Sequence, residues 1–508
     1  MSNSRPNEPF LPFDRQERPT ALADRLWSRY ERLREDGVPD WTFLETVSHL
    51  LLFKRADRRA VRRPGHPARP KLATASEAWR TLRATSNLDL PEVYERILKD
   101  LGSRTETALG RALADTCRVV TDPLLLRELI DDLEEGITPG PDEGEDEGDV
   151  LNALFELTVQ DSRRSGLHHT PRLLVDTLVR LAGPGPADSI ADPACGTGGF
   201  LVAALRHIRE RHPGAALSPS IEPRIEGNEL SPAYRLAGAN LLLQDTSWYG
   251  GPVHVTNANP LHARAFNRAD IVLANPPFGM LDTPPDRTDF AVRTRGRALN
   301  HLQHIMSVLA PGGRAAVVLP DGVLFGKGSA EAVRRLLLHD FDLHTLVRLP
   351  TGIFDGAPGV RTNVLHFTKP HTPSDTPATT HLWVYDLRTG HSFHPTQHPL
   401  RAEDLAGVLK ALRPGDRASR TETPDGRFKR FTYENLINRN DANLDLICPI
   451  AHPTPQDDNP LEAIAAEIAQ NLRAALAEFE AITQALAQAP SQFPLPASAE
   501  PASPASDG

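Results

Sequence analysis

Short apolar runs that alternate with helical segments dominate the middle of the chain and constrain its fold most strongly. They are SIADPA at 189–194, VHVTN at 253–257, ADIVLAN at 269–275, RAAVVLP at 314–320 and LHTLVRLP at 343–350. Such runs, rich in Val, Ile and Leu, are typical of strands buried on both faces of a parallel sheet. Because helical segments such as residues 200–211 separate them, we expect a doubly wound, mostly parallel α/β sheet.

The segments on either side of this region have other patterns. Helical spacing of apolar residues recurs from 20 to about 130, in ALADRLWSRYERL and in WTFLETVSHLLLFK, and again in one long helix near the end. We therefore predict an N-terminal helical domain, an acidic linker, a catalytic domain, a C-terminal partner-binding helix and a disordered tail. Their ranges are 1–135, 136–149, 150–450, 455–488 and 489–508. A loop is expected at 371–380.

The composition is that of a globular protein, with 40% hydrophobic and 24% charged residues among 508. No run of eighteen apolar residues and no basic, apolar leader is found, so we expect neither a membrane span nor a secretory signal. Three widely separated cysteines, Cys117, Cys195 and Cys448, argue against a disulfide scaffold and favour the cytoplasm. No cysteine or histidine spacing predicts a metal site.

The net charge of −10 hides two opposite segments. Residues 131–149 hold ten acidic side chains and no basic one, whereas residues 54–83 hold ten basic side chains against Asp57 and Glu77. The basic segment predicts either phosphate contacts or a solvated basic face that pairs with the acidic run.

A glycine-rich turn, ADPACGTGGFLVAAL at 191–205, follows one predicted strand and opens a predicted helix. Gly196 and Gly198 lack the Cβ atoms that would keep a ligand from the backbone. The helix N-terminus behind them favours an anionic group. Taken alone, the glycines fit a cofactor loop and a simple tight turn equally well.

The next strand ends near an acid that suits a ribose. In IEGNELSP, at 225–232, Glu229 is the candidate acceptor for two ribose hydroxyls and Glu226 the alternative. Glu229 lies 31 residues after Gly198, and an expected loop, RHPGAALSPS, absorbs the excess over the roughly twenty residues that are typical of dinucleotide folds. A merely exposed acid at a strand end is the other interpretation.

The tetrapeptide Asn275, Pro276, Pro277 and Phe278 directly follows the strand ADIVLA. Asn275 is held extended by the proline after it, and the prolines donate no N–H. The Asn275 side-chain oxygen and the Pro276 carbonyl are therefore rigid acceptors, which suit the two hydrogens of an exocyclic amine. Phe278 offers a flat face to a planar base. A plain Asn-Pro turn with a core phenylalanine is the alternative.

A helix is expected within SGLHHTPRLLVDTLVRLAG, at 165–183. Thr170 is its candidate N-cap, Pro171 a first-turn proline and Gly183 the residue after its end.

In this order, the segments resemble the N6-adenine DNA methyltransferases, in particular the modification (M) subunit of type I restriction–modification systems. DPACGTGGF is similar to the family's cofactor motif, NPPF to its catalytic motif, and HHTP to the segment on the other side of the cofactor. Later segments, among them LNHLQHIMSVLAPGGRAAVVLPDGVLF, VRLPTGIF and RTNVLHFTK, extend the likeness over about residues 20–487. The resemblance implies a class I methyltransferase fold.

The resemblance also implies S-adenosylmethionine as cofactor and assigns residues to it. The implied cofactor residues are Thr170, Pro171, Asp192, Pro193, Ala194, Cys195, Gly196, Gly198, Phe200, Glu229 and Asn259. Asp192 and Thr170 would hold the methionine end and Glu229 the ribose. Asn259 stands where the family usually has an acid, His168 and His169 replace its usual aromatic residues, and the spacing from the glycines to Glu229 is stretched.

The implied reaction is direct methyl transfer to adenine N6 in duplex DNA, without a metal. The target adenine must be flipped out of the helix, at a cost of a few kcal/mol, and stacking on Phe278 would offset about 1–3 kcal/mol. The implied partners are double-stranded DNA, a specificity (S) subunit on the C-terminal helix, a second copy of the chain and, in some complexes, a restriction (R) subunit. No DNA-reading motif is found in the chain itself.

Other functions fit parts of the pattern. They are a free-standing adenine methyltransferase, methylation of RNA or of a protein glutamine, a catalytically silent scaffold and a nicotinamide oxidoreductase. NPPF has no role in the last of these.

Overall fold

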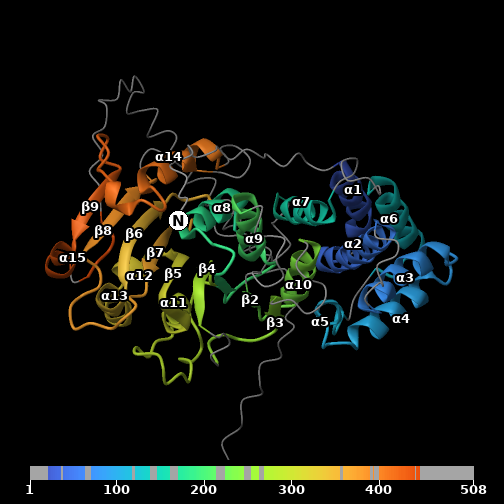
Figure 1. The fold of residues 1–508 in the computed structure, drawn as a ribbon, viewed down its shortest axis with the longest axis horizontal. Helices are drawn as coiled ribbons and strands as arrows, with labels where there is room; N and C mark the ends of the chain where they lie inside the picture. Colours follow the sequence, from blue (N-terminus) through green and yellow to red (C-terminus); the bar gives the residue numbers. More distant parts are fainter. Residues whose placement is uncertain are drawn as a thin grey trace, which may run out of the picture. The chain divides into compact units, whose positions relative to one another are not determined.

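The computed structural model describes residues 21–35, 38–62, 70–116, 120–137, 146–160, 170–212, 224–244, 253–262, 268–354, 359–388, 393, 400–440 and 442–446 (Figure 1). The helices are α1 (Ala21–Glu35), α2 (Asp40–Arg62), α3 (Pro70–Ala84), α4 (Leu90–Gly102), α5 (Ala108–Leu113), α6 (Pro123–Gly136), α7 (Glu147–Gln160), α8 (Arg172–Ala182), α9 (Gly199–Arg211), α10 (Ala233–Leu243), α11 (Arg297–Val308), α12 (Asp321–Phe325), α13 (Ser329–Asp340), α14 (Ala402–Leu412) and α15 (Tyr433–Asn440), with a 3-10 turn, η2, at Arg417–Ser419. The strands are β1 (Ser189–Asp192), β2 (Arg224–Asn228), β3 (Val253–Thr256), β4 (Ala269–Ala274), β5 (Leu309–Pro320), β6 (Asp342–Leu349), β7 (Thr362–Thr368), β8 (His381–Asp386) and β9 (Phe428–Thr432).

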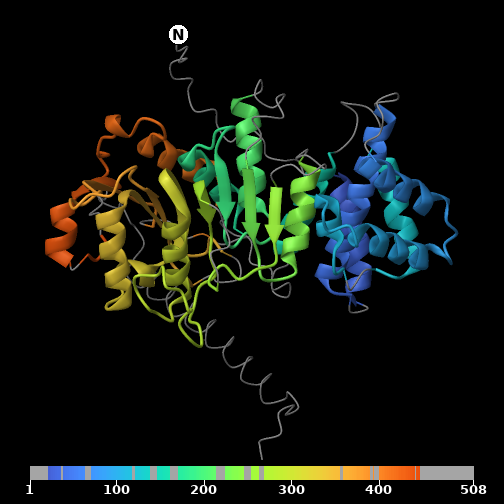
Figure 2. The same cartoon turned by 60° about the horizontal axis from the view of Figure 1, so that its bottom comes forward.

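The strands of the described residues form one nine-stranded sheet, in the order β3-β2-β1-β4-β5-β7-β6-β8-β9 (Figure 2). β1 to β5 pair in parallel. β7 lies between β5 and β6 and is antiparallel to both, while β9 is antiparallel to β8. All five predicted strands are present, and the prediction of a doubly wound, mostly parallel sheet is confirmed.

Helices cover the sheet because the strand side chains are apolar on both faces. On one face, residues of α8, α9 and α14 pack with alternate strand residues such as Ile271 and Leu273. On the other face, residues of α11 and α13 pack with the intervening strand residues, among them Val272 and Ala274. In open α/β sheets of this kind, ligands bind at the carboxyl ends of the parallel strands.

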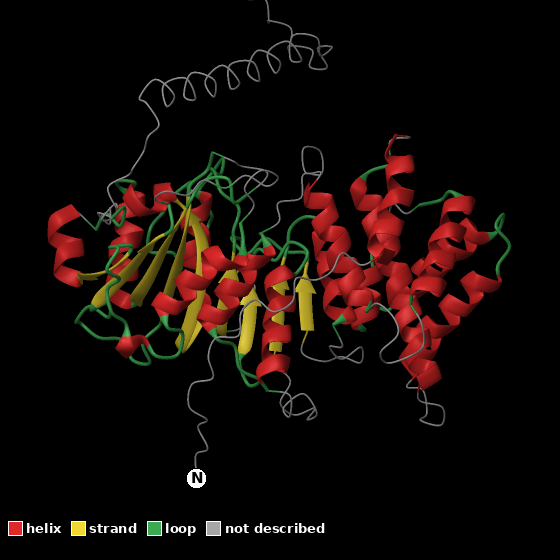
Figure 3. Ribbon diagram, turned by 90° about the horizontal axis from the view of Figure 1, so that it is seen from above, coloured by secondary structure: helices red, strands yellow, loops and turns green. Residues whose placement is uncertain are grey.

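The N-terminal helices α1 to α7 share a hydrophobic core of their own, to which α10 contributes Leu236, Ala239, Leu242 and Leu243. Figure 3 shows this part as helices, without strands among the residues drawn. The predicted boundary at residue 150 does not fit this packing. α7 begins at Glu147, and its Val150, Leu151 and Leu154 are buried in the helical core.

The end of the predicted acidic linker is therefore folded, and ion pairs explain why. Glu147 is fully buried between Arg55 and Arg58 of α2, at 2.7 and 2.6 Å. Nearby, Lys54 lies 2.6 Å from Glu134. A buried carboxylate is tolerated only with such partners. The basic and acidic segments thus pair with each other, as one of the two interpretations predicted, and α2 runs eight residues further than the apolar pattern indicated.

Several predictions fall outside the described residues: the linker residues 138–145, the C-terminal helix at 455–488, the tail at 489–508, and Cys117, Cys448, His168 and His169. The loop predicted at 371–380 is confirmed. Within the described part of the chain, none of the helices has the length and apolarity needed to cross a membrane, and no cluster of His, Cys, Asp and Glu is suited to hold a metal ion.

Candidate active site

Three of the predicted site residues come to one edge of the sheet. Asp192 ends β1, Glu229 follows β2, and Asn275 follows β4. Because β1 pairs in parallel with both β2 and β4, the carboxyl ends of these strands are neighbours. In open α/β sheets this edge is where ligands bind.

The glycine turn between β1 and α9 is held by its own backbone and by the strand next to it. The Cys195 N–H donates to the Asn228 carbonyl at 2.9 Å, and the Gly196 N–H donates to Glu229 Oε2 at 3.0 Å. Gly196 has a φ of +53°, and a Cβ atom built on it would meet no heavy atom within 4 Å. Open space beside Gly196 is what a ligand close to the backbone requires.

Gly198 has a different reason to be glycine than the sequence analysis gave it. Its φ is +85°, and a Cβ atom there would lie 3.4 Å from Cα of Ala237, in α10. The missing side chain thus lets the turn take a left-handed conformation and pack against α10, rather than opening a path for a ligand.

The other residues of the turn are mostly buried. Pro193 and Phe200 are buried, Phe200 within the core beneath the turn, and Ala194 is half-buried. Burial raises the pKa of the Cys195 thiol, and the neighbouring carboxyls raise it further. Cys195 is therefore a neutral packing residue at physiological pH.

Asp192 is a buried acid with one unused oxygen. Its Oδ1 accepts from the Ala194 N–H at 3.0 Å, but Oδ2 is buried and has no hydrogen-bond partner among the described residues. Burial raises the pKa of Asp192 to about 8, the Ala194 N–H lowers it, and the charge of Glu229 raises it. An unpaired buried oxygen of this kind suits a cationic ligand group.

Glu229 lies where the sequence predicts the ribose acid. Its Oε1 accepts from the Ser231 N–H at 2.8 Å and its Oε2 accepts from Gly196, so the carboxylate is fixed beside the glycine turn. The alternative, Glu226, lies inside β2 and forms an ion pair with Arg224 at 3.5 Å. Glu229 is the better placed of the two.

Asn259 lies just after β3, on the far side of β2 from β1. Its side-chain oxygen accepts from the Leu261 N–H at 3.0 Å and closes a turn. The amide Nδ2 is the end of this side chain that remains for a ligand.

The Asn275 amide joins the end of β4 to the residue that precedes α8. Its Nδ2 donates to Thr170 Oγ1 at 2.9 Å, whereas its Oδ1 is buried and has no partner among the described residues. The Pro276 carbonyl also has no hydrogen bond to any described residue. Both acceptors named in the sequence analysis are thus unused by the protein itself.

The rest of the tetrapeptide differs in exposure. Pro276 is buried, Pro277 is exposed, and Phe278 is half-buried between the two cores that flank the sheet. A ring that is only partly covered can stack on a planar group.

The helix α8 begins one residue later than predicted. Its N-cap is Pro171, without a side-chain cap, so Thr170 is not the capping residue. The Thr170 hydroxyl bonds to Asn275 instead. Gly183 ends α8 with a φ of +58° and donates to the Val179 carbonyl, so the predicted helix end is confirmed.

The loop after Phe278 is tied down by polar side chains that the sequence analysis missed. Gln303, in α11, accepts from the Val292 N–H and donates to the Val292 carbonyl, both at 2.9 Å. Asn300 donates to the Thr294 carbonyl at 2.9 Å. Arg287 donates to the Pro260 carbonyl at 2.7 Å and so joins this loop to the one after β3. A signal was present, since NHLQH places several amides and imidazoles in an otherwise apolar helix.

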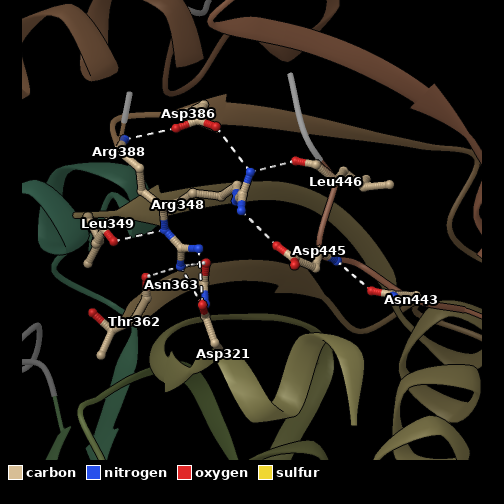
Figure 4. Close-up of polar contacts among 10 residues, drawn as sticks. All are labelled: Asp321, Arg348, Leu349, Thr362, Asn363, Asp386, Arg388, Asn443, Asp445 and Leu446. Carbon is tan, nitrogen blue, oxygen red and sulfur yellow. Dashed lines mark hydrogen bonds and ion pairs between the residues drawn. The ribbon is translucent and has the colours of Figure 1, made fainter. Parts of the chain in front are cut away.

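A second polar set, also missed, lies along the same edge beyond β4 (Figure 4). Arg348, at the end of β6, binds Asp386 at 3.1 Å, Asp445 at 2.7 Å and the Leu446 carbonyl at 2.8 Å. These contacts fasten the segment after α15 to the sheet.

Arg388 completes this set on the side of β5 and β7. It donates to Asp321 Oδ2 at 3.1 Å and to Asn363 Oδ1 at 2.9 Å, and Asn363 donates to Asp321 at 2.8 Å. The two arginines are thus neutralised within the protein, which makes them supports for the edge rather than phosphate ligands.

Comparison with known proteins decides the family. A family model described as N-6 DNA Methylase matches residues 146–458. This chain belongs to the N-6 DNA methylase family. It is an adenine-specific DNA methyltransferase, and its similarity lies with the modification subunits of type I systems. The family decides against the nicotinamide, RNA and glutamine alternatives.

Individual relatives of this methylase cover most of its length. It is 32% identical over 385 residues to the type I restriction enzyme StySPI methylase subunit of Salmonella potsdam, which covers 72% of this chain and 71% of the relative. It is 31% identical over 401 residues to the EcoKI methylase subunit of Escherichia coli strain K12, with 76% and 74% covered. The crystal structure of the EcoKI M protein matches with a TM-score of 0.52 and 28% identity, over 92% of this chain and 96% of that one.

Proposed function

We propose that this methylase transfers a methyl group from S-adenosylmethionine to adenine N6 through the edge formed by β1, β2 and β4, as the modification subunit of a type I complex. The observation that carries the proposal is the pair of unused acceptors at Asn275 and Pro276 beside the glycine turn. Family membership supports the reaction, and the geometry supports the assignment of residues.

The residues present fit the cofactor. The partnerless Oδ2 of Asp192 suits the cationic amino group of the methionine end, the open space at Gly196 admits the ligand to the backbone, and Glu229 suits the ribose. When bound, the cofactor supplies a methyl group on a sulfonium sulfur. The extra positive charge beside Asp192 favours the ionised carboxylate, which opposes the effect of burial.

Asn275 and Pro276 form a clamp, here meaning the two acceptors that bind the adenine amine. Asn275 Oδ1 and the Pro276 carbonyl accept its two hydrogens, which draws the N6 lone pair out of ring conjugation and points it toward the methyl group. Phe278 holds the flipped base by stacking, which is worth about 1–3 kcal/mol. The rate enhancement then comes mostly from positioning, since this mechanism uses no nucleophile of the protein.

We also propose the partners of the complex. A specificity subunit would choose the DNA site, because basic side chains of the segment 54–83 already form ion pairs with carboxylates of the same chain. These side chains are Lys54, Arg55, Arg58, Arg80 and Arg83. A second copy of this chain and a restriction subunit would complete the assembly. A free-standing enzyme is the competing proposal, and site-specific methylation by the purified chain alone would select it.

The direct test uses purified chain with its specificity subunit, tritiated S-adenosylmethionine, and genomic DNA from cells that lack this chain. Asn275→Ala should abolish transfer of label while cofactor affinity stays within about 3-fold, because the amide contacts the amine and not the cofactor. Asn87→Ala removes an exposed amide of the helical part, which accepts from Arg127 at 3.0 Å far from the proposed site residues in sequence, and serves as the matched control. Label transfer by Asn275→Ala at the wild-type rate would rule out the proposed clamp.

A further inference from the structure

The contact between Thr170 and Asn275 joins two segments that are 105 residues apart. Thr170 lies directly before α8, and Asn275 lies directly after β4. Because α8 packs on β4 and β5, these two segments meet at the edge where the site forms. The hydrogen bond is thus a bridge from the strand-end loop to the start of a helix on one face of the sheet.

Thr170 is not needed for the local structure of its own helix. Pro171 begins α8 without a side-chain cap, and the first turn is closed by bonds from Leu174 and Val175 to the Pro171 carbonyl. The Thr170 side chain is half-buried. Its hydroxyl is therefore free of a capping role, and among the described residues Asn275 is its hydrogen-bond partner.

The bond to Thr170 determines which end of the Asn275 amide remains for a ligand. A side-chain amide has a donor end and an acceptor end, and only the acceptor end serves a clamp for an amine. With Nδ2 held by Thr170, Oδ1 is the end left over, and it is the end that is buried and partnerless. Rotation of the amide by half a turn would present two N–H groups to the adenine amine, which is itself a donor.

We propose that Thr170 is a positioning residue for methyl transfer, because its hydroxyl holds the donor end of the Asn275 amide and turns the acceptor end toward the amine. This inference rests on the proposed function and adds a role to the cofactor contact that the family resemblance implies for Thr170. It assigns the orientation of the clamp to a residue outside the catalytic tetrapeptide.

The test compares Thr170→Val with Thr170→Ser in the complete complex. Valine keeps the shape of threonine and removes the hydroxyl, whereas serine keeps the hydroxyl. At saturating cofactor and DNA, Thr170→Val should lower the single-turnover rate about 10- to 100-fold, as expected for a misplaced reacting group. Cofactor affinity is measured separately, because Thr170 is also an implied cofactor residue. The loss of rate should persist at saturating cofactor, and Thr170→Ser should restore the rate to within about 3-fold of wild type.

The matched control is Thr177→Val, in the same helix, where the hydroxyl bonds only to the Leu173 carbonyl. Its rate should equal that of wild type. The proposal is overturned if Thr170→Val keeps the wild-type rate, if it loses only cofactor affinity, or if Thr170→Ser is as slow as Thr170→Val.

A second measurement does not depend on activity. Melting temperatures of the full-length chain are compared for Thr170→Val, Asn275→Ala and the double variant. If the two side chains are bonded, the double variant melts higher than the sum of the single effects predicts, because the second change removes nothing further. Additive effects would overturn the contact. A wild-type complex that transfers no methyl group would refute the proposed function, and this cycle would still decide on the contact.

Discussion

At the scale of single residues, Asp192 is an acid whose buried surroundings oppose its charge. Burial raises its pKa to about 8 from an ordinary value near 4. Between about pH 4 and pH 8, the folded state therefore keeps a proton on Asp192 that the unfolded state has already released. The stability that Asp192 contributes is complete below about pH 4 and is lost as the pH rises toward 8.

Asp192→Asn removes this titration. In the absence of cofactor, the variant should gain stability over wild type by more than about 2 kcal/mol at pH 8 and by much less at pH 5. Its cofactor affinity should fall about 10- to 100-fold, because a charge-assisted bond is lost. Melting at both pH values and a cofactor titration measure the two effects. An equal gain at both pH values would contradict the raised pKa.

Asn275 could be chosen from the sequence because it directly follows a buried strand, and the end of a parallel strand lies at the edge of the sheet where ligands bind. The role of Asp192, by contrast, came from the family resemblance. Thr170 was found at the right place but with the wrong structural role, since a Thr-Pro pair before a helix also suits an N-cap. Only the contact across 105 residues reveals its partner.

At the scale of elements, the packing of the glycine turn on α10 can be tested by substitution. Gly198→Ala puts a Cβ on a left-handed residue beside Ala237 and should destabilise the protein by about 1–2 kcal/mol. Gly199→Ala, at the first residue of α9, meets no atom within 4 Å and should be neutral or slightly stabilising. Denaturant unfolding measures both. An equal loss of stability for Gly198→Ala and Gly199→Ala would show that the left-handed backbone is not the reason for glycine at position 198.

β1, β3, β4, β5 and β6 were predictable because each lies in a short run rich in Val, Ile or Leu. β7, β8 and β9 were not among the predicted strands. The position of β7 between β5 and β6 was not predictable, because strand order depends on long-range pairing such as that of Val317 with Leu365. The start of α7 within the acidic segment was missed for a similar reason. Glu147 becomes helical and buried only because Arg55 and Arg58 meet it from α2.

At the scale of the whole molecule, α10 joins the helical part to the catalytic sheet. One side of α10 packs on Gly198, and another belongs to the helical core. Arg235 of α10 bonds to Glu45 of α2 at 2.6 Å, and both side chains are almost fully buried. The helical part is thus continuous in packing with the glycine turn.

Arg235→Met should lower the free energy of unfolding by about 3–5 kcal/mol, since it leaves the Glu45 carboxylate buried without its partner. Burial already raises the pKa of Glu45, so the loss should shrink as the pH falls and this acid is protonated. Arg96→Met breaks an exposed pair with Glu92 at 3.7 Å and should cost less than about 1 kcal/mol. Denaturant unfolding measures the free energy of unfolding of both variants. A similar loss for the two would contradict the proposed contribution of the buried pair between Arg235 and Glu45.

The C-terminal helix belongs to this scale as well, as a prediction from sequence alone. Deleting residues 460–488 should leave the chain folded but unable to co-purify with the specificity subunit, because the apolar stripe of that helix is the proposed docking face. Deleting only 489–508 is the matched control. Co-purification of the shorter chain would place the partner surface elsewhere.

The most direct test of the account is base-resolution sequencing of modified DNA from cells that carry this chain and its genomic neighbour. With the wild-type chain, N6-methyladenine should occur at one recognition sequence throughout the genome. With Asn275→Ala at equal protein abundance, the mark should vanish from every such site. Methylation that persists in the variant, or a wild-type genome without the mark, would contradict the central claim.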